Sequence, residues 1–167
     1  MKIIALPRLA LEGFPDRATC SVISISSHGF DFPDLSGFRG ICKMKFNDVS
    51  PAFFRKKSLV PEERIREILD SGITKLDIEN VWQFVEERRE AGEDYFVVHC
   101  DAGVSRSPAV AAAISLALTE NVGNFFEDFV PNLYVFGKMM EYFPYARTLK
   151  ARERLKMSPV VKEIRFT

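Results

Sequence analysis

The segment "YFVVHCDAGVSRSPAVAAAI", residues 95–114, constrains the fold more than any other part of the chain. It opens with a continuous apolar run, which is typical of a strand buried on both faces of a sheet. A short polar loop follows, and then a stretch from Ala109 to Leu118 that is apolar almost all round. Such a stretch indicates a buried helix. The segment therefore predicts a central strand that passes through a tight loop into a central helix.

Further strands and helices alternate along the rest of the chain. "CSVISI" (20–25) and "ICKMKF" (41–46) read as strands, and the second alternates, with Cys42, Met44 and Phe46 on one face. One helix is expected from Pro61 to Gly72 and another from Thr74 to Ala91, with "NFFEDF" and "NLYVFGKMMEYF" as two helical pieces around Pro131. The apolar positions of the two longer helices are Ile65, Ile68 and Leu69, and Ile78, Val81, Trp82 and Val85. This alternation predicts an α/β domain.

The length and composition of the chain fit one domain and argue against nucleic-acid-binding and membrane-spanning proteins. At 167 residues and 47% hydrophobic content, the chain can bury a core, and its 23 basic residues balance 23 acidic ones. We therefore expect neither a nucleic acid nor a membrane surface as partner. No stretch is long enough to span a membrane, and the apolar run before Pro7 is too short for a signal peptide.

The three cysteines show no metal-type spacing. Cys20, Cys42 and Cys100 form no C-x-x-C pair, which argues against a structural zinc site. We expect a reducing cytoplasm, in which Cys100 stays a free thiol.

The loop "HCDAGVSRS" can hold an anion and a nucleophile together. A strand that turns tightly into a helix leaves backbone N–H groups unpaired at the helix N-terminus, and they attract an oxyanion such as phosphate. Gly103 permits a backbone conformation that a Cβ would hinder. The same field favours the thiolate of Cys100, and the planar fork of Arg106 can bind two phosphoryl oxygens. Ser107 is placed to contact the sulfur, whereas His99 is expected to shape the loop and not to act as a base.

These residues resemble the H-C-x-x-G-x-x-R-S/T phosphate loop of the cysteine-dependent protein tyrosine phosphatase superfamily. "SRSPAV" is most similar to its compact dual-specificity branch, and "PNLYVFGKMMEYF" is similar to the Pro-Asn opening of a later helix in that branch. The resemblance covers about residues 20–143 in element order. It implies a central mixed, largely parallel sheet flanked by helices, and a mechanism without metal or cofactor. The mid-chain loop argues against the low-molecular-weight phosphatases.

The resemblance also assigns roles to single residues. Cys100 would be the nucleophile that forms a phosphocysteine, and Arg106 would bind phosphate and stabilise the transition state. Ser107 would assist hydrolysis of the intermediate, and Asn132 would brace the site. The backbone N–H groups of the loop would complete the phosphate cradle: Asp101, Ala102, Gly103, Val104, Ser105 and Arg106.

The general acid of such a phosphatase is an Asp on a separate loop. In compact relatives it lies roughly thirty residues before the cysteine, a spacing that falls on Asp70. Asp70, however, reads as the end of a helix. Asp48 directly follows the 41–46 strand and lies 52 positions before Cys100 (100 − 48), so an insertion over residues 50–72 would separate them. We favour Asp48, with Asp70 second, and Asp77 last because it reads as a helix cap.

The sequence thus predicts one phosphatase domain over residues 1–167, with a core at about 20–143 and a basic tail at 147–167. Relatives that act on inositol phospholipids often carry basic residues at the variable positions of this loop. This loop carries none there, so the resemblance favours a phosphoprotein substrate. Phosphotyrosine is expected first, with phosphoserine and phosphothreonine as further substrates. A phosphate-binding pseudophosphatase and a rhodanese-like sulfurtransferase remain alternatives.

Three smaller features each allow two interpretations. Arg55, Lys56 and Lys57 could contact an acidic substrate, although a solvated charge run is the simpler interpretation. The basic tail could likewise meet an anionic partner or be a solvated helix and tail. Cys42 could form a protective disulfide with Cys100 or be a plain core cysteine.

Overall fold

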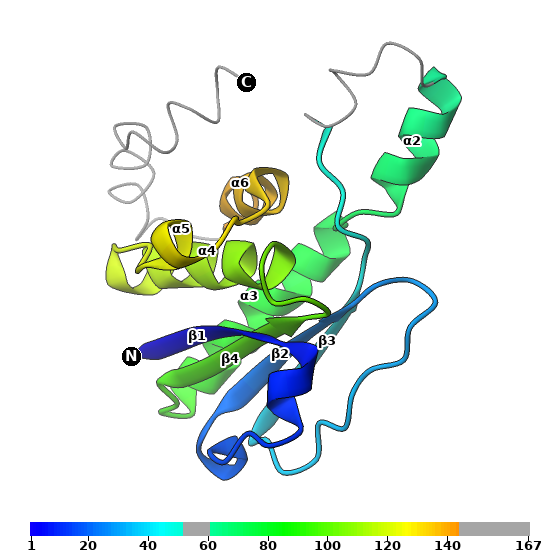
Figure 1. Cartoon of the computed structure of the whole chain (residues 1–167). Helices are drawn as coiled ribbons and strands as arrows, with labels where there is room; N and C mark the ends of the chain where they lie inside the picture. The colour runs from blue at the N-terminus through cyan, green and yellow to red at the C-terminus, as the bar shows by residue number, and fades with distance from the viewer. Residues whose placement is uncertain (52–60, 144–167) are drawn as a thin grey trace.

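The computed structural model describes residues 1–51 and 61–143, which build a four-stranded sheet with helices packed on it (Figure 1). The strands are β1 (Lys2–Pro7), β2 (Ser21–Ser26), β3 (Gly40–Lys45) and β4 (Tyr95–Cys100), in the order β1-β4-β2-β3. All three strand pairs are parallel. The expected α/β class and largely parallel sheet are confirmed, and the described residues form no antiparallel pair in this sheet.

The helices follow the apolar periodicity of the sequence. They are α2 (Glu62–Asp70), α3 (Lys75–Glu90), α4 (Arg106–Thr119), α5 (Phe125–Asp128) and α6 (Leu133–Glu141). The four apolar residues of the α3 stripe are buried, as predicted. The expected face of α2 is only half-buried, and no residue of α2 is fully buried. Figure 1 shows why: α2 lies away from the sheet instead of packing on it.

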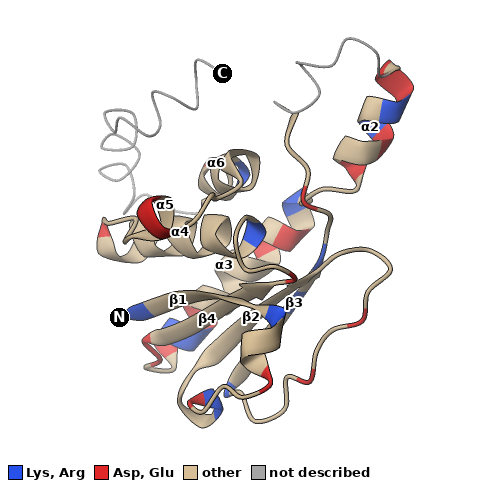
Figure 2. Cartoon of the chain, in the orientation of Figure 1, with Lys and Arg blue, Asp and Glu red and all other residues tan. Residues whose placement is uncertain are grey.

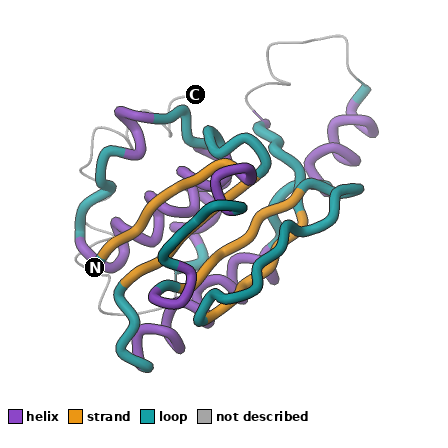
Figure 3. Tube along the Cα trace, turned by 60° about the horizontal axis from the view of Figure 1, so that its bottom comes forward, coloured by secondary structure: helices purple, strands orange, loops and turns teal. Residues whose placement is uncertain are grey.

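The two faces of the sheet are covered differently. The longer helices α3 and α4 lie on one face, where the larger core cluster includes Phe96, Val98 and Ile114. The other face is covered by the 3-10 helices η1 (Arg8–Leu11) and η2 (Arg17–Thr19) and by the loop after β2, with Leu35 and Phe38 in its core. Figure 3 shows these loops in front of the strands and the longer helices behind them.

Charged side chains are common on the outer helices α2 and α3 and rare on the central helix α4. Figure 2 shows Lys, Arg, Asp and Glu along α2 and α3 and mostly uncharged residues along α4. Ten consecutive residues of α4, from Arg106 to Ser115, are buried. Arg106 is the single charged residue among these ten, so its buried position calls for a specific explanation.

The strand β1 was not predicted. The apolar run before Pro7, too short for a signal peptide, forms an edge strand whose residues are mostly half-buried. Its pairing with β4 places residues 2–7 in the sheet, on the N-terminal side of the expected core.

The strand order determines where a ligand can bind. After β1, the chain forms β2 and β3 on one side and leaves a gap of one strand beside β1. It then returns, and β4 fills this gap between β1 and β2. In open parallel sheets, ligands bind at the carboxyl ends of the strands where the order reverses. Cys100 ends β4 at this position.

Two predicted features fall outside the described residues: the basic run of Arg55, Lys56 and Lys57, and the basic tail at 147–167. Within residues 1–51 and 61–143, no helix has the length and hydropathy needed to cross a bilayer.

Candidate active site

The loop between β4 and α4 is closed tightly against the end of β1. Gly103 has a φ of +76°, and a Cβ at this position would lie 2.3 Å from the backbone nitrogen of Pro7. No other residue fits both the left-handed backbone and this approach. The predicted need for glycine is confirmed, and its cause includes a long-range contact that the sequence did not show.

Cys100 lies at the base of this loop with its sulfur inside a ring of donors. The residue is 2% exposed. Its Sγ lies 3.1 Å from Ser107 Oγ and accepts a hydrogen bond from the Gly103 N–H at 3.2 Å. The predicted contact between Ser107 and the sulfur is therefore present. The sulfur therefore lies between the Ser107 hydroxyl, the Gly103 N–H and the N-terminus of α4.

The guanidinium of Arg106 is buried and only partly paired. Its Nη1 donates to the Phe46 carbonyl at 2.7 Å, and its Nη2 donates to Asp101 Oδ2 at 2.6 Å. Its Nε is buried without a hydrogen-bond partner among the residues that the structure describes. The Nε–H and one Nη2 hydrogen point to the same side of the planar group, so this edge can bind two oxygens of a tetrahedral anion.

The carboxylate of Asp101 is the partner that orients Arg106. Its Oδ2 also accepts hydrogen bonds from Ser27 Oγ at 2.7 Å and from the Ser27 N–H at 3.3 Å. Its Oδ1 lies 3.8 Å from Arg8 Nη1. Burial alone would raise the pKa of Asp101, but the hydrogen bonds from Ser27 and Arg106 and the charge of Arg106 lower it below its usual value.

Sequence reasoning used only the backbone of Asp101 and missed Ser27 and Arg8. Both directly follow the carboxyl end of a parallel strand, at the same edge of the sheet as Cys100: Ser27 follows β2, and Arg8 follows β1. Polar residues at strand ends were the available signal. It could be applied only once β1 was recognised as a strand of this sheet.

Asp48 and Asn132 meet at the rim of the loop. Asp48 Oδ1 accepts hydrogen bonds from Ser105 Oγ at 2.9 Å and from Asn132 Nδ2 at 2.7 Å. Asn132 also donates from Nδ2 to the Val49 carbonyl at 3.0 Å and from its backbone N–H to the Ser105 carbonyl at 3.0 Å. The structure thus brings the favoured acid to the phosphate loop, with Asn132 as the bridge between them.

The two other candidate acids lie elsewhere. Asp70 is the last residue of α2, is exposed, and has no hydrogen bond to a residue of the loop. Asp77 caps α3: its Oδ2 accepts from the Thr74 N–H at 2.9 Å, and its own N–H donates to Thr74 Oγ1 at 3.1 Å. The interpretation of Asp77 as a helix cap is confirmed.

His99 is a buried neutral side chain in the strand behind the loop. Its Nε2 lies 2.6 Å from Ser24 Oγ, the residue opposite it in β2. Burial lowers the pKa of His99 to about 4, because the imidazolium would lose its hydration. The hydrogen bond with Ser24 fixes the ring inside the sheet.

A disulfide between Cys42 and Cys100 does not fit the sheet. Cys42 lies on β3 opposite Ile23, which in turn lies opposite Val98 of β4. Two strand spacings separate β3 from β4, about 10 Å, whereas a disulfide needs Cα atoms within about 7 Å. Cys42 is a core cysteine, and burial raises the pKa of its thiol to about 11.

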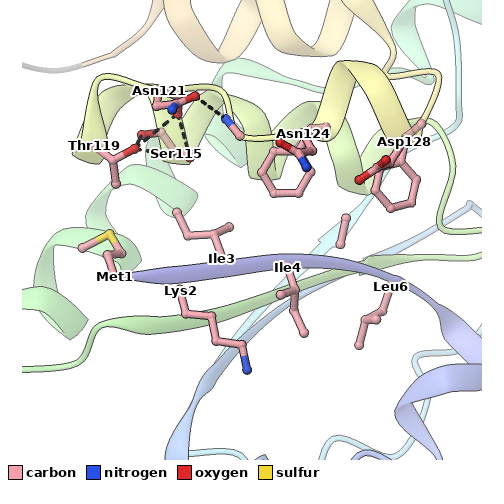
Figure 4. Close-up of a pocket in the computed structure, with 14 residues that line it drawn as sticks. Met1, Lys2, Ile3, Ile4, Leu6, Ser115, Thr119, Asn121, Asn124 and Asp128 are labelled. Atoms are coloured by element: carbon pink, nitrogen blue, oxygen red, sulfur yellow. Dashed lines mark hydrogen bonds between the residues drawn. The ribbon is translucent and has the colours of Figure 1, made fainter.

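A separate pocket of about 810 Å³ lies along the outer edge of β1 (Figure 4). It is bounded by β1 on one side and by the end of α4 and the start of α5 on the other. Ser115, Thr119 and Asn121 are joined there by hydrogen bonds. None of the predicted site residues lines this pocket, so it is distinct from the phosphate loop.

Replacing Gly103 with alanine should disrupt the packing of the loop against β1 and destabilise the protein. The added Cβ must displace backbone atoms of Pro7, and the left-handed φ adds strain, so we expect the free energy of unfolding to fall by about 2–4 kcal/mol. Gly137, on α6, is the matched control because a Cβ there meets no atom within 4 Å. Gly137→Ala should stabilise the protein by about 0.5–1 kcal/mol. Equal effects of the two variants in urea denaturation would contradict the close packing of Gly103.

The buried His99 should make stability depend on pH. Its pKa falls from 6.5 in the unfolded chain to about 4 in the folded protein. Between these values the unfolded chain binds a proton that the folded protein does not, so the free energy of unfolding should decrease as the pH falls through this window. An NMR titration checks the assignment, with a His28→Gln variant to identify the signals. A His99 signal that titrates near pH 6.5 would refute the buried neutral state.

No family model matches the sequence, and no curated protein matches it. Solved structures do match. The human tyrosine phosphatase-like serine/threonine/tyrosine-interacting protein aligns with a TM-score of 0.52 and 15% identity, over 84% of this chain and 89% of that chain. DUSP15 aligns with a TM-score of 0.49 and 16% identity, over 93% and 90% of the two chains. At such identities the likeness concerns the fold. The first of these alignments shows that this chain shares the fold of that tyrosine phosphatase-like protein.

Proposed function

We propose that the protein hydrolyses phosphomonoesters of proteins, phosphotyrosine first and phosphoserine and phosphothreonine as further substrates, through a phosphocysteine intermediate. The observation that carries this proposal is the buried Nε of Arg106, which has no hydrogen-bond partner among the described residues and lies in the loop whose base is Cys100. A buried donor without a partner is costly, and a phosphoryl oxygen would satisfy it. The fold shared with a tyrosine phosphatase-like protein supports a site for phosphorylated side chains, whether they are hydrolysed or only bound.

The first step transfers the phosphoryl group to the protein. The fork of Arg106 and the backbone N–H groups of the loop bind the non-bridging oxygens, and the Cys100 thiolate attacks phosphorus in line with the ester oxygen. The S–P bond forms while the P–O bond breaks. Asp48 gives its proton to the leaving oxygen, so that an alcohol or phenol departs.

The second step releases phosphate. A water molecule attacks the phosphocysteine, the Asp48 carboxylate accepts a proton from that water, and the sulfur leaves as a thiolate. The hydroxyl of Ser107, 3.1 Å from the sulfur, can donate to it as negative charge returns. The products are inorganic phosphate and the free enzyme with Asp48 protonated again.

The hydrogen bonds of Asp48 support its role as the acid. Both of its donors, Ser105 and Asn132, bind Oδ1. Oδ2 receives no hydrogen bond from a described residue and is therefore the oxygen that can hold the proton. The two contacts fix the carboxyl group beside the phosphate loop, as a proton donor to the leaving group requires.

A binding protein that does not hydrolyse its ligand is the second candidate. It is favoured by one finding: the aligned human protein is named phosphatase-like and interacting, so the fold alone does not decide between catalysis and binding. Two features support catalysis: the thiol of Cys100, and the carboxyl group of Asp48 that is held by hydrogen bonds beside the loop. No contact described above specifically supports a rhodanese-like sulfurtransferase. The three cysteines are free, and we propose a reducing cytoplasm as the compartment that keeps them so.

Replacing Cys100 with serine tests the proposed function. Wild-type protein under reducing conditions should hydrolyse para-nitrophenyl phosphate, and Cys100→Ser should reduce turnover to the uncatalysed background because a serine hydroxyl is a far weaker nucleophile at neutral pH. Cys42→Ser serves as the control and should retain turnover, since Cys42 lies in the core of β3. A wild-type protein that binds a phosphopeptide without hydrolysing it would establish the binding candidate. Formation of thiocyanate from thiosulfate and cyanide would establish the sulfurtransferase.

Replacing Asp48 with asparagine tests the acid. Asp48→Asn keeps the side-chain shape but cannot donate the proton, so kcat should fall about 10²-fold or more for phenyl phosphate, whose leaving group needs that proton. The loss should be much smaller for a substrate with a better leaving group, such as 2,4-dinitrophenyl phosphate. Asp70→Asn is the matched control and should retain full turnover. If Asp48→Asn keeps full turnover while Asp70→Asn loses it, Asp70 is the acid.

A further inference from the structure

Exposed apolar side chains gather around the phosphate loop. The described residues include eight large hydrophobic side chains that are exposed, and five of them lie on this loop or on a segment tied to it. We call these five the apolar rim: Leu9, Phe30, Val104, Val130 and Leu133. The other three lie outside the loop: Met1 just before β1, Ile41 on β3 and Leu76 on α3.

Hydrogen bonds attach two rim residues to the loop from the side of α6. Val104 belongs to the loop, and its carbonyl accepts from the Val130 N–H at 3.2 Å. Leu133 directly follows Asn132, whose N–H donates to the Ser105 carbonyl at 3.0 Å. Val104, Val130 and Leu133 are therefore held on the same side of the loop as the proposed acid.

The remaining rim residues are attached from the side of β1 and β2. Leu9 follows Arg8, whose N–H donates to the Asp101 carbonyl at 3.3 Å. Phe30 donates from its N–H to the Ser27 carbonyl, and Ser27 binds the Asp101 side chain. The rim thus reaches the loop from two different directions.

The exposure of the rim is unusual for this chain. Val130 is 80% exposed and Leu9 is 77% exposed, although the same residue types fill the core elsewhere. Apolar side chains gathered beside a site mark surfaces that bind a partner. Burying one or two of them against apolar side chains of a substrate would strengthen the binding of that substrate.

The charges beside the rim favour a peptide over a membrane surface. Asp101 pairs with Arg106 and lies 3.8 Å from Arg8, and Asp48 accepts from Asn132 and Ser105. Among the described residues, the cations that contact the loop are Arg8 and Arg106, and both are paired with the Asp101 carboxylate. Attraction to anionic lipid headgroups requires a cluster of basic residues, which the rim does not contain.

The burial of Cys100 also favours a peptide as the partner of the rim. Cys100 is 2% exposed at the base of the loop, so the phosphorylated side chain must enter while its neighbours remain at the mouth. In an extended peptide, consecutive residues advance about 3.4 Å, so the two or three residues on each side of the phosphorylated one lie over the rim. We propose that the apolar rim binds apolar side chains that flank the phosphorylated residue, and so selects protein substrates with apolar flanks. The inference rests on the proposed function for its catalytic readout.

Two phosphotyrosine peptides of equal length and charge test this inference. One carries Leu and Val at the flanking positions, and the other carries Ser and Gly. Wild-type protein should show a kcat/KM about tenfold higher for the apolar peptide, which corresponds to the burial of one or two side chains. Leu9→Asp and Val130→Asp should reduce that ratio toward one and leave turnover of para-nitrophenyl phosphate unchanged, since that substrate has no flanks.

Leu76→Asp is the matched control, because Leu76 is 65% exposed on α3 and lies outside the rim. It should keep the tenfold preference. Equal kcat/KM values for the two peptides in the wild type, or an equal loss in Leu76→Asp, would overturn the inference. So would rim variants that leave the peptide ratio intact but lower hydrolysis of a phosphoinositide in phosphatidylcholine vesicles, since this would assign the rim to a lipid surface.

Failure of the proposed function gives a different result. In that case wild-type protein hydrolyses neither para-nitrophenyl phosphate nor either peptide. Fluorescence anisotropy of the same two peptides then measures the rim directly. Tighter binding of the apolar peptide, lost in Leu9→Asp and Val130→Asp, would support the rim for a binding protein. Equal binding of both peptides would overturn it.

Discussion

The ion pair between Arg106 and Asp101 is the contact around which the candidate site is built. Asp101 follows β4 and Arg106 begins α4, so their contact at 2.6 Å closes the loop across its own ends. Asp101 is tied to the end of β2 through Ser27 and to the end of β1 through Arg8. Arg106 is tied to the residue after β3 through the Phe46 carbonyl. The carboxyl ends of all four strands are therefore joined through one ion pair, Asp101–Arg106.

Such an arrangement is costly in the absence of a ligand. Arg106 is 5% exposed, and taking a cation out of water is unfavourable unless its partners replace the lost hydration. Two of its three nitrogens have partners, and the third has none among the described residues. Proteins keep unsatisfied buried groups at functional sites, where a ligand completes them. The buried Nε of Arg106, which has no partner among the described residues, is thus the physical basis for proposing a tetrahedral oxyanion as the ligand.

Asn132 shows how a helix cap can join two loops. Its Oδ1 accepts from the N–H groups of Tyr134 and Val135 and caps α6, and its Nδ2 holds Asp48. A single side chain therefore stabilises a helix terminus and fixes the distance between the proposed acid and the phosphate loop. The resemblance suggested a bracing role for Asn132, and the structure supplies the contacts through which it can act. Its effect on turnover remains part of the proposal.

The sequence by itself determined the central unit. The apolar run at 95–100, the glycine at 103 and the apolar stretch after Pro108 specify a buried strand, a left-handed turn and a buried helix, because each depends on local preference and on periodicity. The alternating strand before Asp48 and the stripe of α3 were predictable for the same reason. Only the tertiary structure decided which distant side chains meet the loop. Ser27, Arg8 and the Phe46 carbonyl reach Asp101 and Arg106 because the parallel strand order β1-β4-β2-β3 brings four strand ends to one edge. The same order separates Cys42 from Cys100 by an intervening strand. No local pattern encodes that order, because it follows from how the whole sheet packs against α3 and α4.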